Sequence, residues 1–88
     1  MNARDAMFLL TQASTKVHPG WFNSLDTEVS FDITVNCDGF GGIDAASSEF
    51  QQELDKVEGA VPDGWVLQHR DGFNCESGLG QNFRLCQK

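Results

Sequence analysis

Carboxylates are the chemically active side chains that gather in one stretch of this chain. Ten of its thirteen acidic residues lie between positions 26 and 63, where the only base is Lys56. Like charges one helical turn apart slightly destabilise a helix, so fold stability does not explain this density. A partner with a basic surface does explain it, and a solvated surface that only keeps the protein soluble is the alternative. The candidate partner-binding residues, called the acidic set below, are Glu28, Asp32, Asp38, Asp44, Glu49, Glu53, Asp55 and Glu58.

Calcium binding is a second chemistry for the same stretch, because residues 36–47 partly resemble an EF-hand loop. Asn36, Asp38 and Asp44 fall at its first, third and ninth places and would be the ligands. An aromatic residue occupies the fifth, ligand-bearing place, and Ser47 stands at the twelfth, where a bidentate Glu is expected. We therefore expect a glycine turn followed by a helix cap, with a small calcium-binding domain as the alternative function.

Catalytic and redox chemistry have almost no support in the sequence. The three cysteines form an odd number without the paired spacing of a zinc site or a disulfide framework: Cys37, Cys75 and Cys86. The glycine-rich turn lacks the full phosphate-binding pattern and is flanked by carboxylates, which repel an anion. We expect a protein that is not an enzyme and that uses no cofactor and no metal.

The formal net charge of −7 restricts the partners. Direct contact with DNA, RNA or an anionic membrane is not expected, because phosphate binding needs Lys and Arg. A basic protein surface is the expected partner, and long-range attraction would speed its encounter. The first residues have too short an apolar run for a signal peptide, and no run approaches the ~20 residues of a membrane span. We expect a cytoplasmic protein with reduced thiols.

Helical spacing predicts an N-terminal helix over residues 2–14, capped by Asn2. A strand over residues 7–10 is the alternative for this segment.

Residues 15–27 contain a His-Pro-Gly turn and are expected to be a connection without regular structure. The apolar side chains expected to fold from this connection onto the core are Trp21, Phe22 and Leu25.

A strand and a helix are expected to position the acidic set. Strict alternation predicts a strand over residues 28–37, whose core face carries Val29, Phe31, Ile33 and Val35. Residues 45–59 are expected to form the main helix, with Asp44 as its cap and a stripe of Ala46, Phe50, Leu54 and Val57. The carboxylates that this strand and helix would hold outward are Glu28, Asp32, Glu49 and Glu53.

Two further strands are expected over residues 65–70 and 82–87. The glycine-rich segment 71–81 between them is expected to be a mobile loop, too long for a tight hairpin. Phe73 and Leu79 on this loop are candidate apolar anchors for a partner. The alternative is a loop that folds back on the core.

The expected fold class is α+β, as a single small domain over residues 1–88. The sheet would be three-stranded and mainly antiparallel, with the main helix packed on one face and a short N-terminal helix. The crossover through the main helix would be right-handed if the strands on either side of it lie parallel.

A compact, strongly acidic chain without catalytic residues resembles the small phage-encoded inhibitors such as anti-CRISPR proteins. The acidic set and the size of the chain carry this resemblance, which involves no motif. It implies a viral, non-enzymatic inhibitor that occupies the basic, nucleic-acid-binding surface of a partner protein as a mimic of DNA, in the cytoplasm of the host cell. A structural subunit of a larger assembly is a third function, and the residues leave monomer and homodimer equally open.

Overall fold

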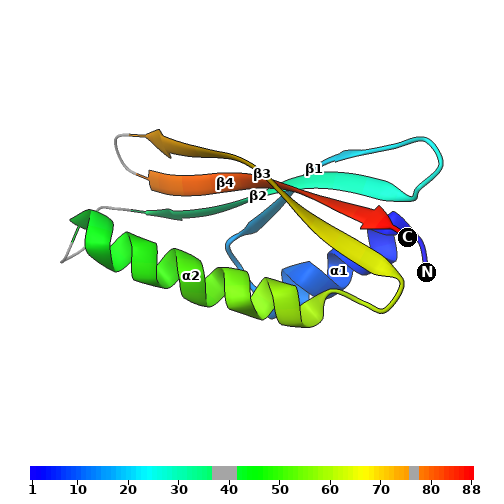
Figure 1. The fold of residues 1–88 in the computed structure, drawn as a ribbon, viewed down its shortest axis with the longest axis horizontal. Coiled ribbons are helices and arrows are strands. Elements are labelled where there is room, and N and C mark those ends of the chain that lie inside the picture. The colour runs from blue at the N-terminus through cyan, green and yellow to red at the C-terminus, as the bar shows by residue number, and fades with distance from the viewer. Residues whose placement is uncertain (37–41, 76–77) are drawn as a thin grey trace.

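The computed structural model describes residues 1–36, 42–75 and 78–88, with the backbone alone for residues 42–44 and 73–75. The elements in chain order are α1 (Ala3–Ala13), β1 (Val17–Phe22), β2 (Glu28–Asn36), α2 (Gly42–Ala60), β3 (Trp65–Cys75) and β4 (Gly78–Gln87). The strands form one sheet in the order β1-β2-β4-β3, and every neighbouring pair is antiparallel. Both helices lie on the same side of this sheet (Figure 1). The α+β class is confirmed, but the sheet has four strands instead of the expected three.

The core lies between the helices and the side chains of β2 and β4 that face them. β2 alternates as its sequence predicts, with Val29, Phe31, Ile33 and Val35 all buried. The register places Phe31 opposite Phe83 of β4, and their rings stack with centroids 5.4 Å apart. Such a pair contributes about 0.5–1.5 kcal/mol beyond the apolar area that it buries. The polar residues of β2 therefore point to the other side of the sheet, which we call the open face.

The N-terminal helix forms as its spacing predicts. The backbone N–H of Asp5 donates to Oδ1 of Asn2 at 2.8 Å, so Asn2 is the cap. One face of α1 is buried in the core through Ala3, Ala6, Met7 and Leu10. The alternative strand over residues 7–10 is wrong, because these residues lie within α1. Helical geometry turns Phe8 outward, where it is 61% exposed.

The main helix also matches its predicted stripe. Ala46, Leu54 and Val57 are buried, and Phe50 packs against the same core. The helix begins at Gly42, so Asp44 lies inside its first turn instead of capping it from outside. Neither of the helices in the described part of the chain is long and apolar enough to cross a membrane.

The expected connection over residues 15–27 contains the strand β1, so that prediction is wrong. Val17 pairs with Ile33, and the pairing shifts register between Pro19 and Phe22. A proline lacks a backbone donor and suits an edge strand, where no neighbour needs that donor. Of the three apolar side chains, Phe22 packs on the core, while Trp21 and Leu25 are 57% and 79% exposed.

The expected loop over residues 71–81 is also mostly strand. β3 continues to Cys75 and β4 begins at Gly78, with Gly72 paired to Gln81 and Phe73 to Gly80. The glycines misled the prediction because they weaken an isolated strand. β4 lies between β2 and β3 and is hydrogen-bonded on both sides, which compensates for that weakness. β2 and β3 are each antiparallel to β4, so they run parallel to each other on either side of it.

Candidate functional site

The acidic set does not form one continuous surface. Glu28 and Asp32 alternate with the buried residues of β2 and therefore lie on the open face of the sheet. Glu49, Asp55 and Glu58 belong to α2, which covers the opposite face (Figure 1). Asp44 lies in the first turn of α2, where only the backbone is described, and Asp38 lies outside the described residues. The sheet thus separates the carboxylates that the sequence places close together.

Glu53 corrects the prediction of an outward side chain, because it is only 9% exposed. Its Oε2 accepts a hydrogen bond of 3.2 Å from Oγ of Ser14, just after α1, and lies 3.1 Å from Nζ of Lys56. A signal for this burial exists in the sequence. Glu53 follows Ala46 by seven residues and precedes Val57 by four, which places it beside the apolar stripe. Glu53 is therefore a helix-joining residue and is removed from the candidate partner surface.

The solvent side of α2 remains acidic. Asp55 and Glu58 are exposed, and Glu49 is half-buried on one flank of the helix. Asp55 accepts a hydrogen bond of 2.9 Å from Gln51, and Glu58 lies 3.4 Å from Nε2 of His69. The one base in α2, Lys56, has its ammonium directed to Glu53. The negative charge of Glu49, Asp55 and Glu58 is therefore not balanced by a base within the helix.

On the open face, by contrast, acids and bases are interleaved. Oε1 of Glu28 lies 3.5 Å from a guanidinium nitrogen of Arg84 and 3.3 Å from the Sγ of Cys86. Burial, and then the hydrogen bond to Glu28, raises the pKa of the Cys86 thiol above its ordinary value. This thiol is therefore held in its neutral form, which does not favour nucleophilic chemistry.

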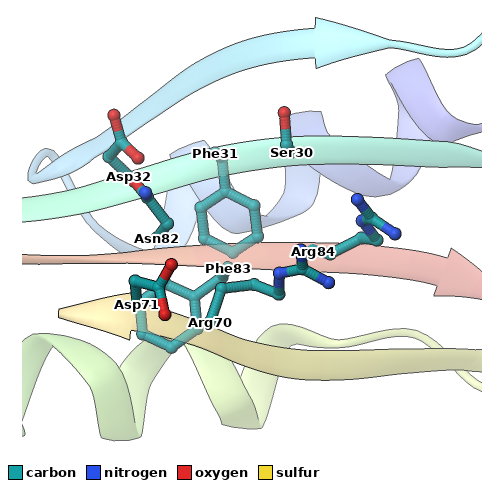
Figure 2. Close-up of a pocket in the computed structure, with 8 residues that line it drawn as sticks. All are labelled: Ser30, Phe31, Asp32, Arg70, Asp71, Asn82, Phe83 and Arg84. Carbon is teal, nitrogen blue, oxygen red and sulfur yellow. The ribbon is translucent and has the colours of Figure 1, made fainter.

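A hollow of about 270 Å³ opens on the same face, lined by residues 30–32 of β2, 70–71 of β3 and 82–84 of β4 (Figure 2). The register places Asp32 between His18 and Asn82, and Ser30 opposite Arg84. Figure 2 shows the side chains of Arg70 and Arg84 directed toward one end of the hollow and Asp32 and Asp71 toward the other. The hollow is thus lined by two cationic side chains at one end and two anionic side chains at the other.

The sequence predictions missed most of this hollow. Only Asp32 was in the acidic set, while Arg70, Asn82 and Arg84 were not considered as site residues. The alternation that places Phe83 and Leu85 inward also places Asn82 and Arg84 outward, so the strand pattern contained part of the signal. The sequence did not contain the pairing of β4 with β2 and β3, which brings the three segments together.

The remaining candidates stay outside any assembled site. Leu79 is half-buried opposite Val35, on the helix-covered side, so it is a sheet residue and not a loop anchor. The side chain of Phe73 is outside the described part. Asn36 is exposed at the end of β2, and no three His, Cys, Asp or Glu residues of the described ranges could together hold a metal ion.

Comparison with known proteins gives no match to a family model, a curated protein or a solved structure. Two surfaces of the described residues stand out: the acidic side of α2 and the hollow on the open face.

Proposed function

We propose that this chain is a non-enzymatic inhibitor or binding module whose acidic surface occupies a basic, nucleic-acid-binding surface of a partner protein. The solvent side of α2 is the observation that carries the proposal. It presents the exposed Asp55 and Glu58 to the partner, with the half-buried Glu49 on one flank, while Lys56 is held by Glu53. On the open face, by contrast, Glu28 already has Arg84 beside it.

The position of these charges within the helix supports the same proposal. Asp55 lies one turn before the C-terminal turn of α2, and Glu58 lies in that last turn, where the helix dipole disfavours negative charge. A carboxylate there costs about 0.3–1 kcal/mol at an exposed position. A base in place of Glu58 would suit the dipole of the helix better, so the carboxylate there is better explained by binding than by folding.

Spacing defines what this surface can mimic. Asp55 and Glu58 are three residues apart, roughly 4.5 Å along a helix, whereas Glu49 lies about two and a half turns before Glu58 and leaves the opposite flank of α2. DNA presents about one negative charge per 1.7 Å of its axis, so α2 offers fewer and more scattered charges than a duplex does. The anti-CRISPR-like form of the proposal is therefore a partial mimic of DNA that contacts a few Lys and Arg residues of a nucleic-acid-binding groove.

Charge reversal separates binding from folding in this proposal. A partner is first captured from the lysate of a candidate host at low and high salt and identified by its mass. Its affinity is then measured for Asp55→Lys and Glu58→Lys, with Asp5→Lys on α1 as the matched control. Each substitution raises the net charge by two. We expect each α2 variant to weaken binding about tenfold while its melting temperature stays the same or rises.

Salt supplies the second half of this test. Screening by added salt weakens attraction between exposed charges, so the affinity should fall steeply between low and high salt. An affinity that is flat with salt, or that responds to Asp5→Lys as strongly as to the two α2 variants, contradicts the proposal.

A structural subunit of a larger assembly is the second candidate, and exposed apolar side chains favour it. Trp21 on β1 and Leu25 in the following turn are large and mostly exposed. Such residues are covered when a neighbour binds over them. Light scattering on the purified chain, compared with Trp21→Ser, tests this candidate. A monomer at all concentrations, with unchanged behaviour of the variant, removes self-assembly as the function.

A further inference from the structure

The hollow on the open face contains an unusual share of the basic residues of this chain. The protein has three arginines, and two of them, Arg70 and Arg84, line this one hollow. They come from β3 and β4: Arg84 pairs with Gln68, and Arg70 lies two residues further along β3, where the register shifts between His69 and Gly72. In a protein of net charge −7, two guanidinium groups at one hollow form a local exception to the acidic surface.

Charge balance indicates the kind of ligand. Asp32 and Asp71 line the hollow together with the two arginines, so its four charged groups sum to zero. A simple anion would be attracted by the arginines and repelled by the carboxylates, and a simple cation would experience the reverse. A molecule with one group of each sign gains at both ends, provided that its charges lie in the matching order.

The arrangement in the hollow supplies that order. The guanidinium groups of Arg70 and Arg84 lie toward one end and the carboxylates of Asp32 and Asp71 toward the other (Figure 2). Ser30 and Asn82 also line the hollow and offer uncharged donors and acceptors. A guanidinium presents a fork of N–H groups that fits a carboxylate, so the arginine end suits a carboxylate well.

Size restricts the ligand further. A hollow of about 270 Å³ is slightly smaller than the ~300–1,000 Å³ of the pockets that take drug-sized ligands. Phe31 and Phe83 also line the hollow, but their side chains are buried in the core on the other side of the sheet, so the side chains that reach the hollow from the open face are polar or charged. The ligand is therefore small and highly polar, without a large apolar part.

We propose that this hollow binds a small zwitterion of the α-amino acid type. The carboxylate of the ligand is bound by Arg70 and Arg84, and its ammonium group by Asp32 and Asp71. Arg84 already has Glu28 at 3.5 Å, whereas Arg70 makes no ion pair with any described residue, so Arg70 is the principal contact of the ligand carboxylate. This site is on the opposite side of the sheet from α2, and the proposal does not rest on the function proposed for that helix.

The test is a titration of the ¹⁵N-labelled protein, followed by the NMR shifts of its backbone amides. The probes are the standard α-amino acids, with acetate as the anion alone and ethylammonium as the cation alone. We expect saturable shifts for at least one amino acid, centred on residues 30–32, 70–71 and 82–84. Acetate and ethylammonium should each bind at least about tenfold more weakly, because each lacks one of the two charged contacts.

Variants assign the two ends of the hollow. Arg70→Gln should weaken binding of the amino acid about tenfold, and Asp71→Asn, which changes an exposed side chain, should do the same from the other end. Lys88→Gln, which removes a cation outside the hollow, should leave binding unchanged. Melting curves of each variant confirm that the fold persists.

Several outcomes overturn this proposal. One is the absence of saturable shifts with every amino acid up to its solubility limit. Another is acetate or ethylammonium binding as tightly as the amino acid, which would show a simple ion site. A third is a set of shifts centred away from the hollow. None of these results bears on the α2 variants, so this proposal and the proposed function can fail separately.

Discussion

Ser14 and Glu53, thirty-nine positions apart, form a buried hydrogen bond of 3.2 Å that joins the end of α1 to the middle of α2. Both residues are almost completely covered, at 4% and 9% exposure. Oγ of Ser14 also accepts from the backbone N–H of Lys16 at 3.1 Å, so this hydroxyl uses both its donor and its acceptor capacity. The helices are therefore held together by a polar contact at the border of the apolar core.

Ser14→Ala should lower the free energy of unfolding by about 1–3 kcal/mol. The substitution removes the donor to Glu53 and leaves a buried carboxylate with Lys56 as its remaining described partner. Ser48→Ala is the matched control, because Ser48 is exposed on the same helix as Glu53. Urea unfolding measures both variants. Equal stability of the two would show that the contact contributes nothing.

Replacing each of two glycines by alanine should change the stability of the protein in opposite directions. Gly64 has a φ of +87°, and a Cβ there would meet no atom within 4 Å, so Gly64→Ala costs backbone strain alone, about 1–2 kcal/mol. Gly59 lies in α2 with the same open space around it. Gly59→Ala should stabilise the protein by about 0.5–1 kcal/mol through helix propensity. Thermal unfolding measures the melting temperature of both variants. A shift of this temperature in the same direction for both would contradict the explanation.

Phe83→Ala should be among the most damaging single substitutions in this chain. Phe83 is fully buried, stacks on Phe31 and contacts the ring of His69 edge-on at 5.1 Å between centroids. A cavity of this size costs about 3–5 kcal/mol. Phe8→Ala removes the same side chain from an exposed position on α1 and should cost much less. Circular dichroism with chemical unfolding compares them, and a loss for Phe8→Ala as large as that for Phe83→Ala would be unexpected.

The thiol of Cys86 should react slowly with alkylating reagents below pH 9. Its raised pKa, caused first by burial and then by the hydrogen bond to Glu28, keeps the thiolate fraction low at a given pH. Glu28→Gln removes the negative charge beside the sulfur, so the pKa should fall and the rate at pH 8 should rise. The measurement is the pH dependence of alkylation in a chain that also carries Cys37→Ser and Cys75→Ser.

Asp32→Asn is the control for that experiment. It removes one negative charge from the same face, but Asp32 is not among the groups that raise the pKa of Cys86. Its alkylation profile should match that of the parent chain. A change as large as that of Glu28→Gln would mean that the general charge of the open face, and not the contact with Glu28, controls the thiol.

The sequence by itself determined the elements with a clear local period. β2 follows from strict alternation around Phe31, and α2 follows from the stripe that ends near Val57. In both elements the buried side can be predicted from the spacing of residues that are close together in the sequence. The cap of α1 by Asn2 is local for the same reason. The excess of carboxylates is likewise a property of composition and needs no structure.

Only the tertiary structure decided which strands exist at the edges and which charges meet. Pro19 and Gly80 look like turn residues, yet both lie in strands, because β2 supplies a hydrogen-bonded neighbour to each of their segments. The same pairing places Arg70, Asn82 and Asp32 around one hollow, although they come from three strands. Register between distant segments is set by the packing of the whole core, so no local pattern shows it. For the same reason no local pattern shows that Glu53, which the helix presents beside its stripe, is buried and accepts a hydrogen bond from Ser14 at the end of the other helix.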